Sequence, residues 1–159
     1  MPQMLTFTPN PALDVATTVA QLLESHKMRC EAPQLHPGGG GINVARVLHR
    51  LGADVLALYP AGGANGERLH QLLQAEGVPD LPLPVADETR QSFTAHEAST
   101  GREYRFVLPG PTLSPAEWQA ALARLRAEQL RDIGRDIKNH TLANLDFYLE
   151  TYAANVERA

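Results

Sequence analysis

The sequence has little cysteine and no long apolar run, and each shortage excludes a class of protein. Cys30 is the one cysteine among the 159 residues, so no disulfide can form within the chain. No apolar stretch approaches the roughly 20 residues that a membrane-spanning helix needs. The first residues contain neither a basic segment nor an apolar one, so no signal peptide is expected. These shortages predict a cytoplasmic protein with no membrane partner, in which Cys30 is packed and inert.

The sequence also lacks an excess of positive charge. Its 14 Lys and Arg stand against 18 Asp and Glu, and a formal charge of −4 gives no reason to expect binding to nucleic acid. It contains no internal repeat, and apart from one glycine run it has no low-complexity tract. A chain of this length is long enough for one domain with its own core.

The most distinctive segment is a run of four glycines, Gly38–Gly41, that leads directly into a predicted helix over 42–51. Ordering four glycines costs much backbone entropy, which suggests that another group must approach this backbone closely. A glycine loop at a helix start presents unpaired N–H groups and the positive end of the helix dipole. The run therefore predicts a site for a phosphate or a sugar phosphate; the alternative is a flexible linker.

Strand and helix patterns alternate around this run. A short apolar strand over 4–8 ends at prolines, and a nearly continuous apolar run over 54–59 is typical of a buried parallel strand. Helical periodicity over 42–51 lies between these two strands. A second helical pattern over 67–75 separates the strand over 54–59 from a further short strand over 81–85. This order predicts a parallel α/β layer with right-handed crossovers.

Two other segments have the pattern of antiparallel ribbons. Strands over 17–19 and 27–31, with alternating polar and apolar residues, would form a flap between the first strand and the glycine run. Strands over 91–97 and 103–108 would form a hairpin. A helix that follows over 114–127 begins with a capping box, Ser114 to Glu117.

Several charged side chains are candidates for ligand binding. Asp14 closely follows the first strand, where open α/β sheets place such groups, although a turn-capping role is equally consistent with the local sequence. Arg90, Arg102 and Arg105 belong to the hairpin region, and a guanidinium matches the oxygens of a phosphate. For any one of these arginines the alternative is a solvated surface position.

Six segments together resemble motifs of the PfkB (ribokinase-like) carbohydrate kinases. The resemblance covers about residues 4–127 and is closest to the bacterial minor 6-phosphofructokinase branch. Related 1-phosphofructokinases usually have a lysine in the glycine run where this chain has Gly40. The segments are Thr8–Asp14, Lys27–Pro33, Pro37–Arg46, Pro60–Gly63, Thr89–Gln91 and Gly101–Val107.

The resemblance implies an α/β fold: the N-terminal part of a three-layer α/β/α sandwich, with a small β lid over about 17–32 and 91–107. It implies transfer of phosphate from Mg-ATP to the 1-hydroxyl of fructose 6-phosphate. Asp14 would hold sugar hydroxyls, and the lid strands would form the face of a homodimer. The sugar site would be lined by Gly39, Gly40 and Asn43, and the 6-phosphate would be bound by Lys27, Arg90 and Arg105.

The chain departs from the family in lacking the Gly-Ala-Gly-Asp loop that supplies the catalytic base. The same half of the family fold holds most of the ATP site, so residues 1–127 form a partial kinase domain, truncated and expected to be inactive alone. No catalytic or metal-binding residue is assigned. Two alternatives to a 6-phosphofructokinase remain open: a non-catalytic sugar-phosphate-binding fragment, and a relative of 1-phosphofructokinase or tagatose 6-phosphate kinase.

A helical tail is predicted over 128–159. Its apolar residues recur at spacings of three and four and form a seam that could mediate assembly or pack on the domain. Residues 132–159 resemble the N-terminal helices of lactate-utilisation iron–sulfur proteins, and we therefore favour a foreign segment joined near residue 127. No cysteine cluster accompanies these residues, so no iron–sulfur site is implied. The seam comprises Leu142, Leu145, Leu149, Tyr152 and Val156.

Overall fold

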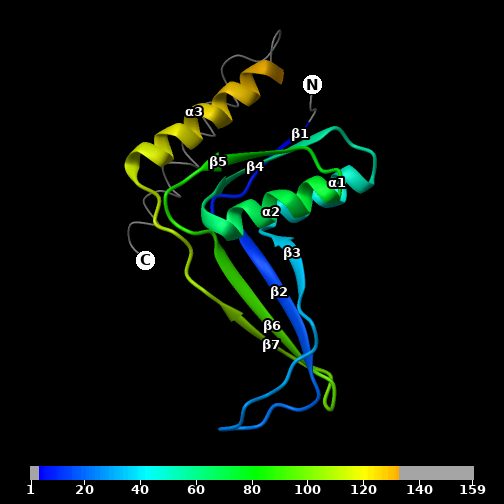
Figure 1. Cartoon of the computed structure of the whole chain (residues 1–159). Coiled ribbons are helices and arrows are strands. Elements are labelled where there is room, and N and C mark those ends of the chain that lie inside the picture. Colours follow the sequence, from blue (N-terminus) through cyan, green and yellow to red (C-terminus); the bar gives the residue numbers. More distant parts are fainter. Residues whose placement is uncertain (1–3, 133–159) are drawn as a thin grey trace.

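The computed structural model describes residues 4–132, which form two sheets and three helices (Figure 1). Within this range, no helix combines the length and the hydropathy needed to cross a bilayer. Helix α3 (Pro115–Asp132) continues through residue 127, near which the junction is predicted. The rest of the predicted tail, with its apolar seam, lies outside the described residues and stays a prediction.

The central sheet consists of three parallel strands in the order β1–β4–β5, as the alternating pattern predicts. In its register, Leu58 in the middle strand is aligned with Phe7 on one side and Leu81 on the other. The strands are β1 (Met4–Phe7), β4 (Val55–Ala61) and β5 (Asp80–Pro84).

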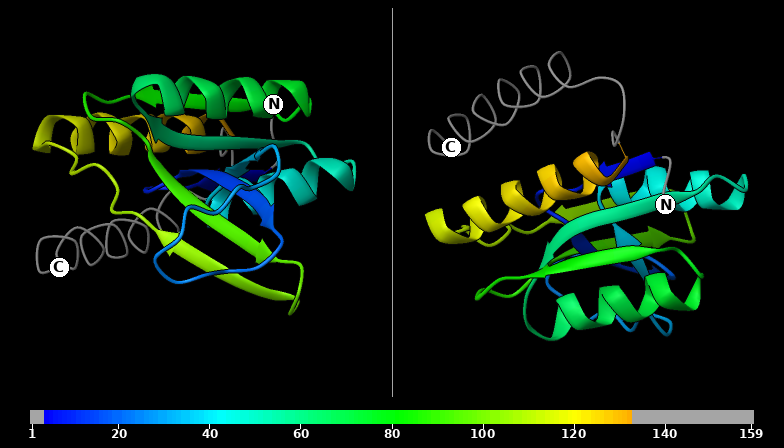
Figure 2. Two further views of the ribbon diagram at one scale, coloured as in Figure 1. Left: turned by 60° about the horizontal axis from the view of Figure 1, so that its bottom comes forward. Right: turned by 90° about the horizontal axis from the view of Figure 1, so that it is seen from above.

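Helices cover both faces of this sheet and make the three-layer arrangement. Helices α1 (Gly40–Arg50) and α2 (Gly63–Ala75) pack against β4, while α3 lies on the side of the sheet opposite α2 (Figure 2). Alternate residues of β4 face one buried cluster, as period-2 alternation requires. That cluster comprises Ile42, Ala45, Val55, Ala57, Tyr59, Leu69, Leu73 and Val78.

The start of α3 has the capping box that the sequence predicts. The Ser114 N–H donates to a carboxylate oxygen of Glu117 at 2.7 Å, and the Glu117 N–H donates to Ser114 Oγ at 3.3 Å. The other oxygen of Glu117 accepts the Ala86 N–H at 2.7 Å. One side chain thus caps the helix and ties it to the loop after β5.

A second sheet extends away from the helices as a lid (Figure 1). Its strand order is β3–β2–β6–β7, with β2 and β6 parallel and the two outer pairs antiparallel. The register aligns Asp14 of β2 with His36 of β3 and Ser92 of β6. The strands are β2 (Ala12–Val19), β3 (Gln34–Gly38), β6 (Arg90–Glu97) and β7 (Arg102–Val107).

The predicted lid strand over 27–31 is wrong, and β3 takes its place beside β2. Only Cys30 forms an isolated bridge, to Val19. The alternating pattern suggested one buried face, but every residue of 27–31 is exposed, so no apolar face is buried to hold a strand. Cys30 is likewise exposed, contrary to the expected packed thiol.

The two edges of the central sheet differ chemically. The Val85 N–H and the Pro79 carbonyl form hydrogen bonds with β4. Because backbone hydrogen-bonding groups alternate in direction along a strand, Pro82 and Pro84 have their backbone nitrogens at the outer edge of β5, where proline offers no N–H. Among residues 4–132, no strand pairs with the outer side of β1. The open edge of the described sheet is therefore at β1.

Candidate functional site

The glycine run joins β3 to α1 and packs against the end of β1, so it is not a flexible linker. Gly39, the N-cap of α1, has φ = 122°, and a Cβ there would lie 2.5 Å from Thr8 Cγ2. A Cβ at Gly41 would lie 2.6 Å from Thr8 Oγ1, whereas one at Gly40 would meet nothing within 4 Å. Close packing against Thr8 thus requires two of the glycines, and Gly40 faces open space.

Thr8 also takes part in the capping of α1. Its hydroxyl accepts the Ile42 N–H at 2.8 Å in a buried position. The sequence predicted that amides at this helix start are free for an anion, and for Ile42 the structure corrects this, because that donor is satisfied within the protein. No local pattern marks Thr8, since its partner lies 34 residues away.

Asp14 lies within β2 rather than in a turn, which excludes the turn-capping alternative. Its carboxylate packs directly against Gly38, where a Cβ would overlap it. Burial raises the pKa of Asp14 above its ordinary value, while electrostatic interactions with Arg90, Arg105 and His36 act to lower it. The result is a partly desolvated carboxyl group surrounded by cationic or ionisable side chains.

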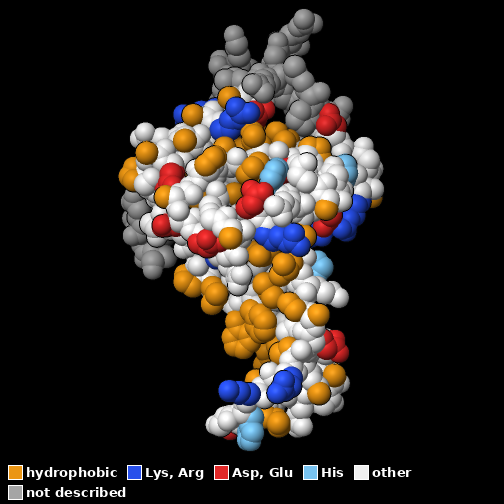
Figure 3. Space-filling model, in the orientation of Figure 1, with side chains coloured by type: hydrophobic (Ala, Val, Ile, Leu, Met, Phe, Trp, Pro, Cys, Tyr) orange, Lys and Arg blue, Asp and Glu red, His pale blue; other side chains and the backbone are white. Residues whose placement is uncertain are grey.

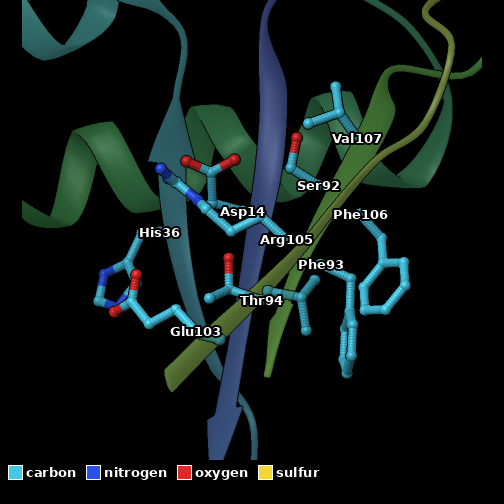
Figure 4. A pocket seen from close by; sticks show the side chains of 11 residues that line it. Asp14, His36, Ser92, Phe93, Thr94, Glu103, Arg105, Phe106 and Val107 are labelled. Carbon is cyan, nitrogen blue, oxygen red and sulfur yellow. The ribbon is translucent and has the colours of Figure 1, made fainter. Parts of the chain in front are cut away.

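Two arginines approach this carboxyl group from the lid strands. Arg105 of β7 extends across the sheet toward Asp14 (Figure 4). Arg90, at the start of β6, donates from Nη1 to Ser92 Oγ at 3.0 Å and from Nε to Asn10 Oδ1 at 3.1 Å. Hydrogen bonding by the Ser92 hydroxyl also acts to lower the pKa of Asp14. This arrangement brings together a carboxylate that can accept hydrogen bonds from hydroxyl groups and guanidinium groups that can bind an anion.

A cavity of about 290 Å³ opens beside these groups on the lid (Figure 4). Polar groups and two aromatic rings line it, and the rings of Phe93 and Phe106 have centroids 6.1 Å apart. The polar lining includes Asp14, His36, Ser92, Glu103 and Arg105. His36 and Ser92 could not be predicted from the sequence, because the pairing that aligns them with Asp14 is long-range.

Lys27 and Asn43 lie apart from this cavity. The segment between β2 and β3 runs to the far end of the lid (Figure 1). Lys27 belongs to this segment, is exposed and lines none of the described cavities. Asn43, on the first turn of α1, receives a hydrogen bond from Arg46 at 3.4 Å. One copy of the chain therefore does not bring Lys27 to Asp14.

The residues for a nucleotide or a metal ion are not identified in this chain. Among the described residues, no group of three or more His, Cys, Asp or Glu side chains could hold a metal ion. No Gly-Ala-Gly-Asp sequence occurs in the 159 residues. No side chain of this chain is therefore assigned to Mg-ATP.

Comparisons with known proteins agree with the fold and with these motifs. The model of the pfkB family carbohydrate kinases matches residues 10–143. Over 125 residues the chain is 52% identical to ATP-dependent 6-phosphofructokinase isozyme 2 of Mycobacterium tuberculosis, covering 79% of this chain and 37% of that protein. It is 35% identical over 124 residues to 1-phosphofructokinase of Vibrio cholerae, covering 78% of this chain and 39% of that protein.

A solved structure extends this agreement to three dimensions. Phosphofructokinase-2 from Escherichia coli in complex with fructose-6-phosphate superposes with a TM-score of 0.76 at 42% identity, covering 80% of this chain and 42% of that one. The α/β fold is therefore ribokinase-like, as the sequence predicts. The chain spans less than half the length of the relatives it matches. It belongs to the pfkB family of carbohydrate kinases.

Proposed function

We propose that this chain binds fructose 6-phosphate and forms the acceptor half of an ATP-dependent 6-phosphofructokinase. One observation carries the proposal: a partly buried carboxylate and two arginines meet beside the glycine loop. Asp14 accepts hydrogen bonds from sugar hydroxyls, while Arg90 and Arg105 bind the 6-phosphate. Gly39, Gly40 and Asn43 line the sugar. Positioning the acceptor is a large part of catalysis in phosphoryl transfer.

The choice of substrate within the family rests on two observations. Identity is higher to a 6-phosphofructokinase, at 52%, than to a 1-phosphofructokinase, at 35%. Gly40 also leaves open space at the position where 1-phosphofructokinases usually have a lysine. Both favour fructose 6-phosphate over fructose 1-phosphate, the substrate of a 1-phosphofructokinase.

Calorimetry with the 159-residue chain tests the proposal. Fructose 6-phosphate is expected to bind and fructose is not, because the phosphate supplies the charge-assisted contacts. Arg105→Ala is expected to weaken binding about tenfold or more, since a hydrogen bond to a charged group contributes about 1.5–3 kcal/mol. Arg102→Ala is the matched control, because it removes the same charge from the same strand but on the opposite face of the sheet. Its affinity should stay within about twofold of wild type.

Three results would contradict the proposal. These are no heat with millimolar fructose 6-phosphate, equal binding of fructose, and equal losses in the two arginine variants. A coupled ATP assay on the same protein addresses catalysis separately. Because no catalytic base is assigned among these residues, we expect no turnover above the blank, and clear turnover would refute the binding-only interpretation of this chain.

We also propose that two copies associate through the lid. Phe106 and Val107 of the outer strand β7, and Leu108 directly after it, are 54%, 72% and 50% exposed. Hydrophobic side chains gather on the lid in Figure 3. An exposed apolar patch of this kind is typical of an interface. Such a dimer also gives Lys27 a role, because a residue distant from its own Asp14 can contact the phosphate held by the partner.

Light scattering tests this association. Wild-type chain is expected to have the mass of a dimer, and Val107→Asp is expected to give a monomer, because a charge in an apolar interface is costly. Val47→Asp is the matched control, since Val47 is 53% exposed on α1, outside the lid. A monomeric wild type, or a mass that Val107→Asp leaves unchanged, argues against the lid interface.

A further inference from the structure

Arg46 links the glycine loop to the end of a distant helix. Its guanidinium forms a two-point ion pair with Glu76, the C-cap residue of α2, at 2.8 Å from Nε and 2.6 Å from Nη2. The side chain is 17% exposed. The Arg46 hydrogen bonds are the main cause that lowers the pKa of Glu76, so the pair persists under mildly acidic conditions.

The remaining nitrogen of this guanidinium points back to the loop. Nη1 donates to the Pro37 carbonyl at 3.2 Å and to Asn43 Oδ1 at 3.4 Å. The Pro37 carbonyl belongs to the peptide that leads into Gly38, the residue against which Asp14 packs. Arg46 thus contacts both the backbone behind Asp14 and a side chain on the first turn of α1.

The donor character of arginine fixes the orientation of the Asn43 amide. A guanidinium carries donors only, so the Asn43 atom that faces it must be the oxygen. The Asn43 NH2 group is then directed away from Arg46 and is available to a ligand oxygen. Without Arg46 the amide is free to rotate and to present either atom, and part of the binding free energy is spent on ordering it.

We propose that Arg46, anchored by Glu76, is a positioning residue of the sugar-phosphate site that fixes the peptide before Gly38 and the amide orientation of Asn43. The inference rests on the proposed function, because it concerns the binding of the same ligand. Arg46 itself does not contact the ligand; it acts through the loop and through Asn43. The structural alternative is a surface ion pair that only stabilises the fold.

Binding measured on matched variants separates these two roles. Arg46→Gln is expected to weaken binding of fructose 6-phosphate about tenfold in calorimetry, because the contacts to the Pro37 carbonyl and to Asn43 are lost. Arg50→Gln is the matched control: Arg50 also binds Glu76, at 3.2 Å, but neither Pro37 nor Asn43 is among its partners. Its affinity should stay within about twofold of wild type. Arg46→Lys keeps the charge beside Glu76 and so the fold, yet should still lose most of the affinity.

A double-variant cycle tests whether the effect passes through Asn43. If it does, combining Arg46→Gln with Asn43→Ala lowers the affinity by clearly less than the product of the two single losses. Losses that multiply, wild-type affinity in Arg46→Gln, or equal losses in Arg46→Gln and Arg50→Gln would each overturn the inference. No binding by the unaltered chain would instead overturn the proposed function, and the inference with it.

Discussion

Gly39→Ala is expected to lower the free energy of unfolding by about 3 kcal/mol or more, the sum of backbone strain and overpacking. The φ of 122° at Gly39 belongs to a region that side chains with a Cβ rarely adopt, and that Cβ would lie 2.5 Å from Thr8 Cγ2. Displacing Thr8 would also disturb the bond that caps Ile42. Urea unfolding followed by circular dichroism measures the change.

Gly40→Ala is the control for this experiment. The neighbouring glycine is the first residue of α1, and a Cβ there meets nothing within 4 Å. Alanine is the better helix former, so the variant is expected to be unchanged or more stable by up to about 1 kcal/mol. Equal effects of the two substitutions would show that the packing against Thr8 does not determine the stability of this loop.

The fold could be predicted from the sequence where local signals were strong. Prolines and glycines mark the ends of the elements, and the apolar run over 54–59 indicates the central strand of the parallel sheet. The capping box at Ser114 specifies the start of α3 within one residue. Each of these signals lies within a few residues of the feature that it predicts.

The pairing within the lid could not be predicted from the sequence. The alternating segment 27–31 imitates a half-buried strand, whereas β3 (Gln34–Gly38) contains Pro37 and ends on the first glycine of the run. What selects β3 is its register with β2, which aligns His36 with Asp14. Strand pairing depends on partners that are distant in the sequence, so the groups around Asp14 could be recognised only in part.

Asp14→Asn is expected to weaken binding of fructose 6-phosphate about tenfold or more, because a charged acceptor is replaced by a neutral one. The same variant is expected to be more stable than wild type at neutral pH. Burial raises the pKa of Asp14, which means that the folded chain disfavours the charged form. Asparagine has a similar shape without that cost. Calorimetry and urea unfolding at pH 7 measure the two opposite changes.

The pH dependence of this pair of variants has a definite sign. The Asp14 carboxyl binds its proton more tightly in the folded chain than in the unfolded one. Its contribution to stability is therefore lost as pH rises from the ordinary pKa of about 3.9 through the raised value. The stability advantage of Asp14→Asn should disappear below that range, and the ratio of the two affinities should approach one as Asp14 becomes protonated. Titration of the ligand's phosphate affects both variants alike and cancels in the ratio. An affinity ratio that does not change between neutral and acidic pH would mean that the charge of Asp14 does not contribute to binding.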